Sequence, residues 1–320
     1  MKKNIAVVAG GSSSEYVISM KSAALILACI DTERFSPYLV IVEKGGWHAK
    51  LPDQDCPVNR DDFSVEHEGQ KVRFDYVYNI IHGTPGEDGK IQGYFDLLNI
   101  PYTGCGVLAG SITFNKSVCK QLVRSHGITT PQSVVLRQQQ PYSVEQLTLE
   151  LSFPCFVKPN NGGSSFGASK VDQASNLGEA IRKAFEHDRE VLIEEYISGR
   201  ELTCGVYLED GMARALPITE IVTENAFFDF QAKYEGASEE ITPARVDEET
   251  TERCQRLTER IYTVLGCRGL ARIDYILRDG ELYFIEANTT PGCSPESIIP
   301  QQIRAAGLDI KKIINDQLLV

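Results

Sequence analysis

Four polar side chains interrupt two apolar segments near the C-terminal end of the chain. Arg272 and Asp274 lie in the first segment, and Glu286 and Asn288 lie in the second. Side chains in a strand alternate between the faces of a sheet, so the members of each pair share a face. Carboxylate and amide oxygens are hard donors that Mg²⁺ takes together with water and phosphate oxygens. The spacing indicates a cation and phosphate site on a hairpin, and an exposed salt bridge is the alternative that these residues leave open.

The connection between the two segments decides how these polar pairs meet. The apolar residues of both segments are odd-numbered, so they face one core only if directly paired residues have an even sum. A two-residue turn at 279–280 gives an odd sum. We therefore predict a three-residue loop at 278–280, with its glycine left-handed in a bulge. This loop would bring Arg272 opposite Glu286 and place Asp274 diagonal to it.

A loop of small residues, NNGGSSFG, follows the apolar strand that carries Lys158. Glycines let backbone amides approach an anion, and the hydroxyls of Ser164 and Ser165 add donors. The loop fits neither the P-loop pattern nor the dinucleotide pattern G-x-G-x-x-G. A phosphate cover and an ordinary hairpin both remain compatible with it. Glu201, further along, either holds a pair of ribose hydroxyls or is simply exposed.

Strands and helices have to position these residues. In the first hundred residues apolar strands alternate with helices, which predicts an open parallel sheet. The last third has longer strands and a long helix at about 248–265. Between them, the polar and aromatic stretch 223–240 is long enough to suggest a functional loop. We predict three domains, comprising residues 1–104, 105–200 and 201–320.

The composition is that of an ordinary globular protein. Its 320 residues exceed one average domain, and 42% are hydrophobic and 24% charged. Nine cysteines without a C-x-x-C pair, and apolar runs too short for a signal peptide or a membrane helix, favour a cytoplasmic protein. The net charge of −12 disfavours a nucleic-acid surface. We therefore expect neither nucleic-acid nor membrane partners.

Seven motifs, taken in order, resemble the ATP-grasp superfamily and, within it, the D-alanine:D-alanine ligase family. They are GGSSSEYVIS (10–19), HGTPGEDGKIQG (82–93), YTGCGVLAGSITFNK (102–116), KPNNGGSSFG (158–167), FFDFQAKY (227–234), ARIDY (271–275) and EANTTPG (286–292). The resemblance implies an α/β (α+β) ATP-grasp fold, in which an N-terminal open parallel sheet precedes two domains whose antiparallel sheets sandwich ATP. It also implies a homodimer that joins two D-alanines through an acyl phosphate, for peptidoglycan precursor synthesis.

The resemblance assigns roles to the matching positions of this chain. Nucleotide contacts are implied for Lys116, Lys158, Ser164, Ser165, Glu194, Glu195, Ile197, Glu201 and Asn288. Two Mg²⁺ or Mn²⁺ ions are implied at Asp274, Glu286 and Asn288. Substrate contacts are implied for Glu15, His82, Lys233, Tyr234, Arg272 and Ser297. Catalytic roles are implied for Glu15, Ser164, Tyr234, Arg272, Gly292 and Ser297.

Some of these roles can be stated as chemistry. Glu15 would neutralise the ammonium of the first substrate, and its alternative is a carboxylate favoured at the start of a helix. Arg272 and the backbone amide of Gly292 would stabilise the transferring phosphoryl group and the tetrahedral charge. The stretch 223–240 would be a lid that excludes water. Tyr234 within it would favour the dipeptide-forming type over D-lactate ligases.

Three other functions are compatible with parts of this pattern. A depsipeptide or D-serine ligase shares most of the motifs. A nucleotide-binding regulator without turnover has no need of the complete set of lysines and polar hairpin residues. A dehydrogenase built on the first strand is the least compatible, because the glycine spacing of GGSSS departs from the dinucleotide pattern.

Overall fold

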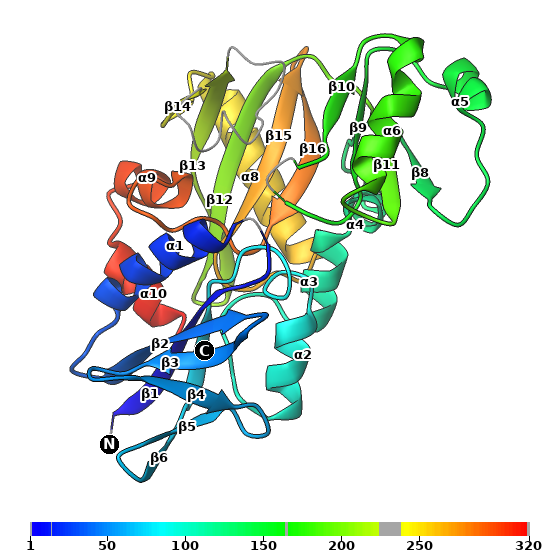
Figure 1. Cartoon of the computed structure of the whole chain (residues 1–320). Coiled ribbons are helices and arrows are strands. Elements are labelled where there is room, and N and C mark those ends of the chain that lie inside the picture. Colours follow the sequence, from blue (N-terminus) through cyan, green and yellow to red (C-terminus); the bar gives the residue numbers. More distant parts are fainter. Residues whose placement is uncertain (1, 14, 164–165, 224–237, 319–320) are drawn as a thin grey trace.

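The computed structural model describes residues 2–13, 15–163, 166–223 and 238–318, whose strands form three sheets. In Figure 1 the seven-stranded sheet lies at one end of the molecule, and the five-stranded and four-stranded sheets lie at the other. The first sheet comes from the N-terminal part of the chain, and the other two are antiparallel. This arrangement confirms the predicted fold class.

The N-terminal sheet is parallel on one side and antiparallel on the other. β1 (Lys3–Gly10) lies between β2 (Phe35–Glu43) and β7 (Tyr76–Asn79) and is parallel to both, as predicted. The sequence analysis missed the short strands between β2 and β7, which extend the sheet in antiparallel fashion. They are β3 (Gly46–Lys50), β4 (Asp55–Asn59), β5 (Ser64–His67) and β6 (Gln70–Arg73).

Both faces of the N-terminal sheet are covered. The odd-numbered side chains of β1 pack with α1 (Tyr16–Cys29), and the even-numbered ones pack with α2 (Lys90–Leu97). A continuous apolar run is typical of a strand that is buried on both sides, and β1 is such a run. The first face is completed by the last two helices of the chain, α9 (Ile298–Ala305) and α10 (Ile310–Asp316). The N-terminal core therefore includes residues from both ends of the sequence.

The four-stranded sheet has its own core. Its strands, in spatial order, are β10 (Ser169–Val171), β9 (Cys155–Pro159), β11 (Glu190–Glu195) and β8 (Ser133–Arg137). α5 (Val144–Glu150) and α6 (Leu177–Phe185) pack against it, with the short 3₁₀ helix at Ala174–Asn176 leading into α6. The buried residues of α6 lie three and four positions apart, which gives the helix one apolar face.

The five-stranded sheet carries the polar hairpin. Its strands, in spatial order, are β14 (Ser238–Ile241), β13 (Met212–Thr223), β12 (Arg200–Glu209), β15 (Ala271–Arg278) and β16 (Glu281–Asn288). Its core includes α8 (Glu248–Val264) and also residues of α3 (Val107–Phe114) and α4 (Lys116–Ser125). The helices at 107–125 thus share a core with the last third of the chain, and the domain boundaries near 104 and 200 remain a prediction.

The turn of the hairpin differs from the prediction. Arg278 pairs with Glu281, so the connection is a two-residue turn. The turn residues Asp279 and Gly280 both have positive φ, 51° and 79°. Positive φ at both positions is the type I′ geometry that an Asp-Gly pair favours, because its twist matches that of the strands. The predicted three-residue loop is wrong.

A bulge in β16 compensates for the shorter turn. Tyr275 pairs with Phe284 but Asp274 pairs with Glu286, so Ile285 is an extra residue on β16. The buried positions of β16 accordingly change from even to odd numbers along the strand: Leu282, Phe284 and Ala287. The predicted odd-numbered apolar face is right for β15 but wrong for the first half of β16.

The bulge also sets which polar side chains meet. Asp274 lies directly opposite Glu286, and Arg272 lies opposite Asn288 instead of opposite Glu286 as predicted. Directly paired residues share a face of the sheet, so the four polar side chains still converge. The four polar side chains therefore form the predicted cluster, but the pairing of the two strands differs from the predicted one.

Candidate active site

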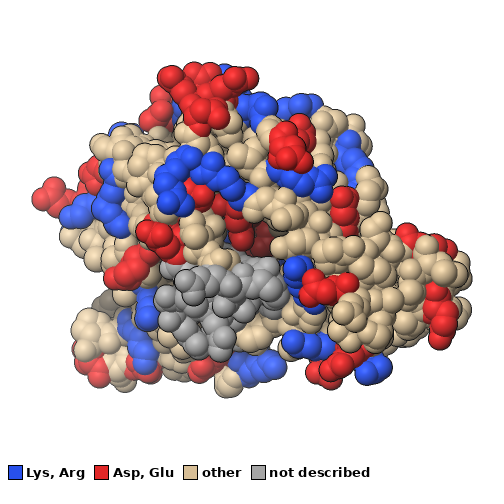
Figure 2. Space-filling view, turned by 90° about the horizontal axis from the view of Figure 1, so that it is seen from above, with Lys and Arg blue, Asp and Glu red and all other residues tan. Residues whose placement is uncertain are grey.

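Two adjoining cavities lie where the three sheets approach one another. Their volumes are about 730 and 380 Å³. Six residues line both: Glu15, Phe114, Lys116, Gly162, Gly163 and Glu286. In Figure 2 acidic side chains lie inside a recess near the middle of the face seen from above, and lysine and arginine side chains lie along its rim. A ligand in one cavity can therefore contact a ligand in the other near Lys116 and Glu286.

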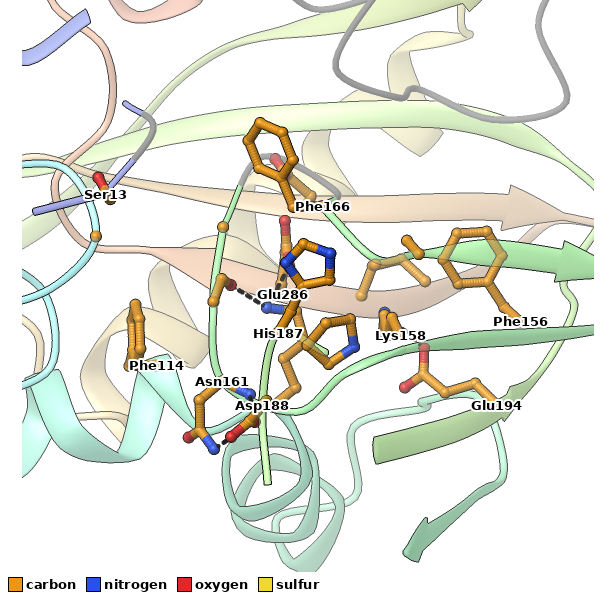
Figure 3. Close-up of a pocket in the computed structure, with 18 of the residues that line it drawn as sticks. Ser13, Phe114, Phe156, Lys158, Asn161, Phe166, His187, Asp188, Glu194 and Glu286 are labelled. Atoms are coloured by element: carbon orange, nitrogen blue, oxygen red, sulfur yellow. Dashed lines mark hydrogen bonds and ion pairs between the residues drawn. The ribbon is translucent and has the colours of Figure 1, made fainter. Parts of the chain in front are cut away.

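A buried ion-pair cluster forms part of the wall of the larger cavity. Glu194 on β11 accepts from Lys158 on β9, 2.7 Å between Oε2 and Nζ, and its Oε1 pairs with Lys120 on α4. The side chains of Lys120, Glu194 and Lys158 are 1%, 4% and 9% exposed. Burial raises the pKa of Glu194, but the two ammonium groups outweigh it and hold the pKa below its ordinary value. Figure 3 shows Lys158 and Glu194 among the residues that line this cavity.

Lys116 connects the glycine loop to the polar hairpin. Its Nζ donates to the carbonyl oxygen of Gly162 at 2.6 Å and lies 3.4 Å from Oε2 of Glu286. Asn160 fixes this lysine relative to β9, because its carbonyl oxygen accepts from the Lys116 N–H and its side-chain oxygen accepts from the Ser117 N–H. Both predicted phosphate lysines, Lys116 and Lys158, therefore lie on the wall of one cavity.

The hairpin presents hard oxygen donors at the junction of the cavities. The guanidinium of Arg272 donates to both oxygens of Asp274, each at 2.9 Å, and Thr203 donates to Oδ1 of Asp274 at 2.5 Å. Glu286 lies opposite Asp274, and the Oδ1 atom of Asn288 accepts from the Thr290 N–H. Two carboxylates and an amide form a donor set that suits Mg²⁺, with room left for water and phosphate oxygens.

Part of the wall of the larger cavity is apolar. Phe156 and Ile197 come from the four-stranded sheet and the segment after it, and Ile276 and Ile285 come from the hairpin. Phe156 shares a face of β9 with Lys158, so this strand offers an apolar surface next to a cation. Flat aromatic and aliphatic walls around a few charged groups suit a nucleoside with its phosphates. Glu195 and Glu201, both predicted nucleotide contacts, also line this cavity.

The smaller cavity contains the predicted contacts of the first amino acid. Glu15 and His82 both line it. A Cβ atom on Gly163 would lie 2.9 Å from Oε2 of Glu15, so the absence of a side chain lets the glycine loop approach this carboxylate. His82 is buried, and its Nε2 lies 3.3 Å from the hydroxyl of Ser22. Burial lowers the pKa of His82, so the imidazole is neutral at pH 7.

Glu87 is a carboxyl group of this cavity that the sequence analysis did not select. It accepts from the N–H of Gly83 at 2.7 Å and from the N–H of Thr290 at 3.2 Å. Burial, and then the charge of Glu15, raises the pKa of Glu87 to about 8. Glu87 thereby joins the first sheet to the segment that follows β16, and it carries a proton at pH 7.

Part of the wall of the smaller cavity comes from β14, the segment after β16 and the start of α9. Gly292 and Ser297 lie there as predicted, and the hydroxyl of Ser297 accepts from the Ser294 N–H at 3.0 Å. Glu240 lies on the same wall and accepts from the amide of Gln301 at 2.7 Å. Burial raises the pKa of Glu240. The sequence analysis assigned no role to Glu240.

Four predicted residues lie outside the described residues, and the structure does not test them. They are Ser164, Ser165, Lys233 and Tyr234. Residues 224–237 of the predicted lid lie outside as well. The remaining predicted site residues all line one or both cavities. Of the described helices, none is long and apolar enough to cross a membrane.

Some of the missed residues had a signal in the sequence. Lys120 follows Lys116 by four positions on α4, so both had to lie on one face of that helix. Ile276 shares the parity of Asp274 and could have been assigned to the cavity face of β15. Glu87 lies inside a recognised motif, but its contact with Thr290 depends on the tertiary fold. For Glu240 no local pattern pointed to a site.

Comparison with known proteins gives a consistent result. A family model described as "D-ala D-ala ligase N-terminus" matches residues 4–105, and one described as "D-ala D-ala ligase C-terminus" matches residues 122–319. A D-alanine–D-alanine ligase of Bacteroides fragilis (strain YCH46) is 51% identical over 318 residues, covering 99% of this chain and 98% of that one. A D-alanine–D-alanine ligase of Porphyromonas gingivalis (strain W83) is 48% identical over 319 residues, covering 98% and 96%.

Solved structures show the same similarity. The VanG D-Ala:D-Ser ligase from Enterococcus faecalis superposes with a TM-score of 0.89 at 32% identity, covering 99% of each chain. D-alanyl-alanine synthetase A from Vibrio cholerae has a TM-score of 0.88 at 29% identity, covering 100% of this chain and 99% of that one.

Proposed function

The chain belongs to the D-alanine–D-alanine ligase family, and from this premise we propose that its two adjoining cavities join two D-alanines at the expense of ATP, for peptidoglycan precursor synthesis. The observation that carries the proposal is the shared wall at Lys116 and Glu286, where a nucleotide in the larger cavity meets an amino acid in the smaller one. Direct phosphoryl transfer needs such a contact, because the acceptor oxygen has to lie in line with the bond that breaks.

In the first step a carboxylate oxygen of the first D-alanine attacks the γ-phosphorus of ATP, and the bond to the β-phosphate oxygen breaks. ADP leaves, and an acyl phosphate remains. Lys116 and Lys158 hold the phosphates, while Glu15 holds the ammonium of the first D-alanine near His82. Arg272 faces the transferring group from the hairpin and stabilises its charge.

In the second step the amine of the second D-alanine attacks the acyl carbon. Phosphate leaves, the peptide bond forms, and the amine loses its proton. The backbone N–H of Gly292 would stabilise the oxyanion, and Ser297 would contact the substrate carboxylate; support comes from the position of both residues in the lining of the smaller cavity. Glu240 adds a carboxyl group to the same wall.

The hairpin donors suit divalent cations. We propose that Asp274, Glu286 and Asn288 hold two Mg²⁺ or Mn²⁺ ions. The ions neutralise negative charge on the terminal phosphates when bound. Support comes from the donor set, which places two carboxylates directly opposite each other in the register of β15 and β16.

We also propose a cytoplasmic homodimer. All nine cysteines are free and buried, which suits a reducing compartment. The dimer rests on the family resemblance, and light scattering of the purified enzyme at micromolar concentration tests it. A mass of one chain would contradict the dimer and leave the chemistry untouched.

The experiment that tests the function is an ADP-release assay with D-alanine, D-serine and D-lactate supplied separately, each with ATP and Mg²⁺. We expect ADP release that depends on D-alanine and yields the dipeptide. ADP release at the same rate without an amino acid would contradict ligation. Glu286→Gln serves as the inactive control.

D-serine is the second candidate for the acceptor. The high structural similarity to a D-Ala:D-Ser ligase favours its inclusion. D-alanine remains the first choice because relatives near 50% identity over the whole chain are D-alanine–D-alanine ligases. Mixed-product analysis with D-alanine and D-serine at equal concentration decides between them, and an excess of the D-alanyl-D-serine product would reverse the assignment.

A further inference from the structure

Lys120 has no part in the function proposed so far, although it is among the largest fully buried side chains. It lies on α4 and pairs with Oε1 of Glu194, while Lys158 pairs with Oε2 of the same carboxylate. One buried carboxylate thus has two lysine partners, one on each oxygen. Two positive charges around one negative charge leave a net charge of +1 in a nearly water-free place.

The two lysines differ in access to the ligand. Lys158 and Glu194 line the nucleotide cavity, whereas Lys120 is not among its lining residues. Lys120 is fixed behind the carboxylate, on the helix that also carries Lys116. Only Lys158 can therefore exchange its protein partner for a phosphate oxygen of the nucleotide.

This exchange would be costly without a second cation. Removing one partner of a buried ion pair is strongly destabilising, because it leaves an uncompensated buried charge. If Lys158 were the sole partner of Glu194, phosphate binding would have to offset this loss. With Lys120 in place, Glu194 stays paired when Lys158 turns away.

We propose that Lys120 is a positioning residue for nucleotide binding, which holds Glu194 by one oxygen so that the ammonium of Lys158 can move from the other oxygen to a phosphate of the nucleotide. The proposal rests on the assignment of the larger cavity to ATP. Burial lowers the pKa of Lys120 to about 8, although the charge of Glu194 acts in the opposite direction. The lowered pKa shows that burying the ammonium group of Lys120 is unfavourable in itself.

The test is a double-mutant cycle read by direct binding of the β,γ-methylene analogue of ATP with Mg²⁺, measured by calorimetry. Lys120→Met should weaken binding about tenfold, because Glu194 then competes more strongly for Lys158. In the Glu194→Gln background the same substitution should change affinity less than about twofold, because no carboxylate is left to compete. An equal loss in both backgrounds would overturn the proposal.

One further variant and one further measurement distinguish this role from a purely structural effect. Lys312→Met removes an exposed lysine ion pair far from the cavities and should leave the affinity unchanged. In assays, Lys120→Met should raise the KM for ATP about tenfold and leave the KM for D-alanine within about twofold. A rise of both KM values together would contradict the proposal.

A measurement on Lys158 keeps the proposal testable even if Lys120→Met does not fold. Because Lys120 keeps Glu194 paired, Lys158→Met should lose nucleotide affinity while its unfolding temperature stays within a few degrees of the wild type. A Lys158→Met protein that unfolds far below the wild type would show that Glu194 depends on Lys158, and would overturn the proposal. If the wild type fails to bind the analogue at all, the assignment of the cavity to ATP is wrong instead.

Discussion

The two cavities differ in how their charges are balanced before any ligand arrives. In the larger one Lys158 already pairs with Glu194, and Lys116 pairs with Glu286 where the two cavities meet. In the smaller one Glu87 and Glu240 accept from uncharged N–H groups. Among the described residues neither Glu87 nor Glu240 has a lysine, arginine or histidine nitrogen within 4.0 Å.

The difference matches the charges of the ligands that we assign. A nucleotide brings several negative charges, so it can take over lysines that carboxylates have held in place. Amino acids bring an ammonium group each, which can pair with a carboxylate of the smaller cavity such as Glu15. Burial is the main cause of the raised pKa values of Glu87 and Glu240, and the charge of Glu15 raises the pKa of Glu87 further.

The largest effect is expected at Glu286, one of the residues that line both cavities. Glu286→Gln keeps the shape but removes the charge that pairs with Lys116 and that is proposed to hold a cation. We expect kcat to fall by about 10³ because a preorganised charge at the transferring group is lost. Steady-state ADP release measures this. Glu281→Gln, at the exposed end of the same strand, is the matched control. Similar activity in both variants would contradict a catalytic role for Glu286.

A smaller effect, confined to the nucleotide, is expected from the bulge. Deletion of Ile285 would leave β16 with regular alternation, in which Phe284 stays buried and Glu286 stays on the cavity face. We therefore expect a folded enzyme whose KM for ATP rises about tenfold, because an apolar wall residue of the larger cavity is lost. A changed KM for D-alanine with an unchanged KM for ATP would refute this assignment of Ile285.

Glu240 allows a similar test of the smaller cavity. Glu240→Gln should raise the KM for D-alanine about threefold and leave the KM for ATP unchanged, because a carboxyl group that lines only the smaller cavity is replaced by an amide. Glu239 is exposed and lies next to Glu240 on β14, so its side chain points to the opposite face. Glu239→Gln is the matched control, and equal effects of both substitutions would count against a role for Glu240.

The smallest effect concerns stability. The pKa of Glu87 is raised from 4.5 to about 8, so the folded protein binds a proton there that the unfolded chain releases. Stability from this group is therefore lost as pH rises from about 4.5 towards 8. Glu87→Gln has no such proton. The unfolding temperature of the variant minus that of the wild type should therefore increase by a few degrees between pH 5 and pH 9. Parallel pH curves for the two proteins would disprove the shift.

The sequence could predict the residues of the site better than their partners. Alternation along β9 and β15 is local, so the faces of Lys158, Arg272 and Asp274 follow from two-residue periodicity. The bulge at Ile285 could not be found in this way, because the alternation was assumed to be regular along the whole second strand. Under that assumption the apolar residues share one face only with a three-residue loop, so the wrong turn was predicted. The Asp-Gly pair was in fact the stronger signal, since it determines a tight turn through backbone conformation alone.

Contacts between segments far apart in the sequence could not be predicted either. Lys120 and Glu194 are 74 positions apart, and nothing near either residue specifies the other. The same is true of α3 and α4, which were assigned to the central domain and share a core with the five-stranded sheet. Periodicity tells which face of an element is apolar, but not which of several apolar faces it will meet.

The packing of the last helices on the first sheet affects how the protein can be made. Asn315 on α10 accepts from the N–H of Asp31 and donates to the carbonyl oxygen of Cys29, while the Tyr76 hydroxyl donates to the carbonyl oxygen of Gln317. During translation the N-terminal sheet emerges from the ribosome long before the residues that cover it. The face that α1 covers is completed only by α9 and α10, so part of it stays exposed until synthesis is almost finished. The nascent chain therefore needs protection from aggregation until these last helices have been made.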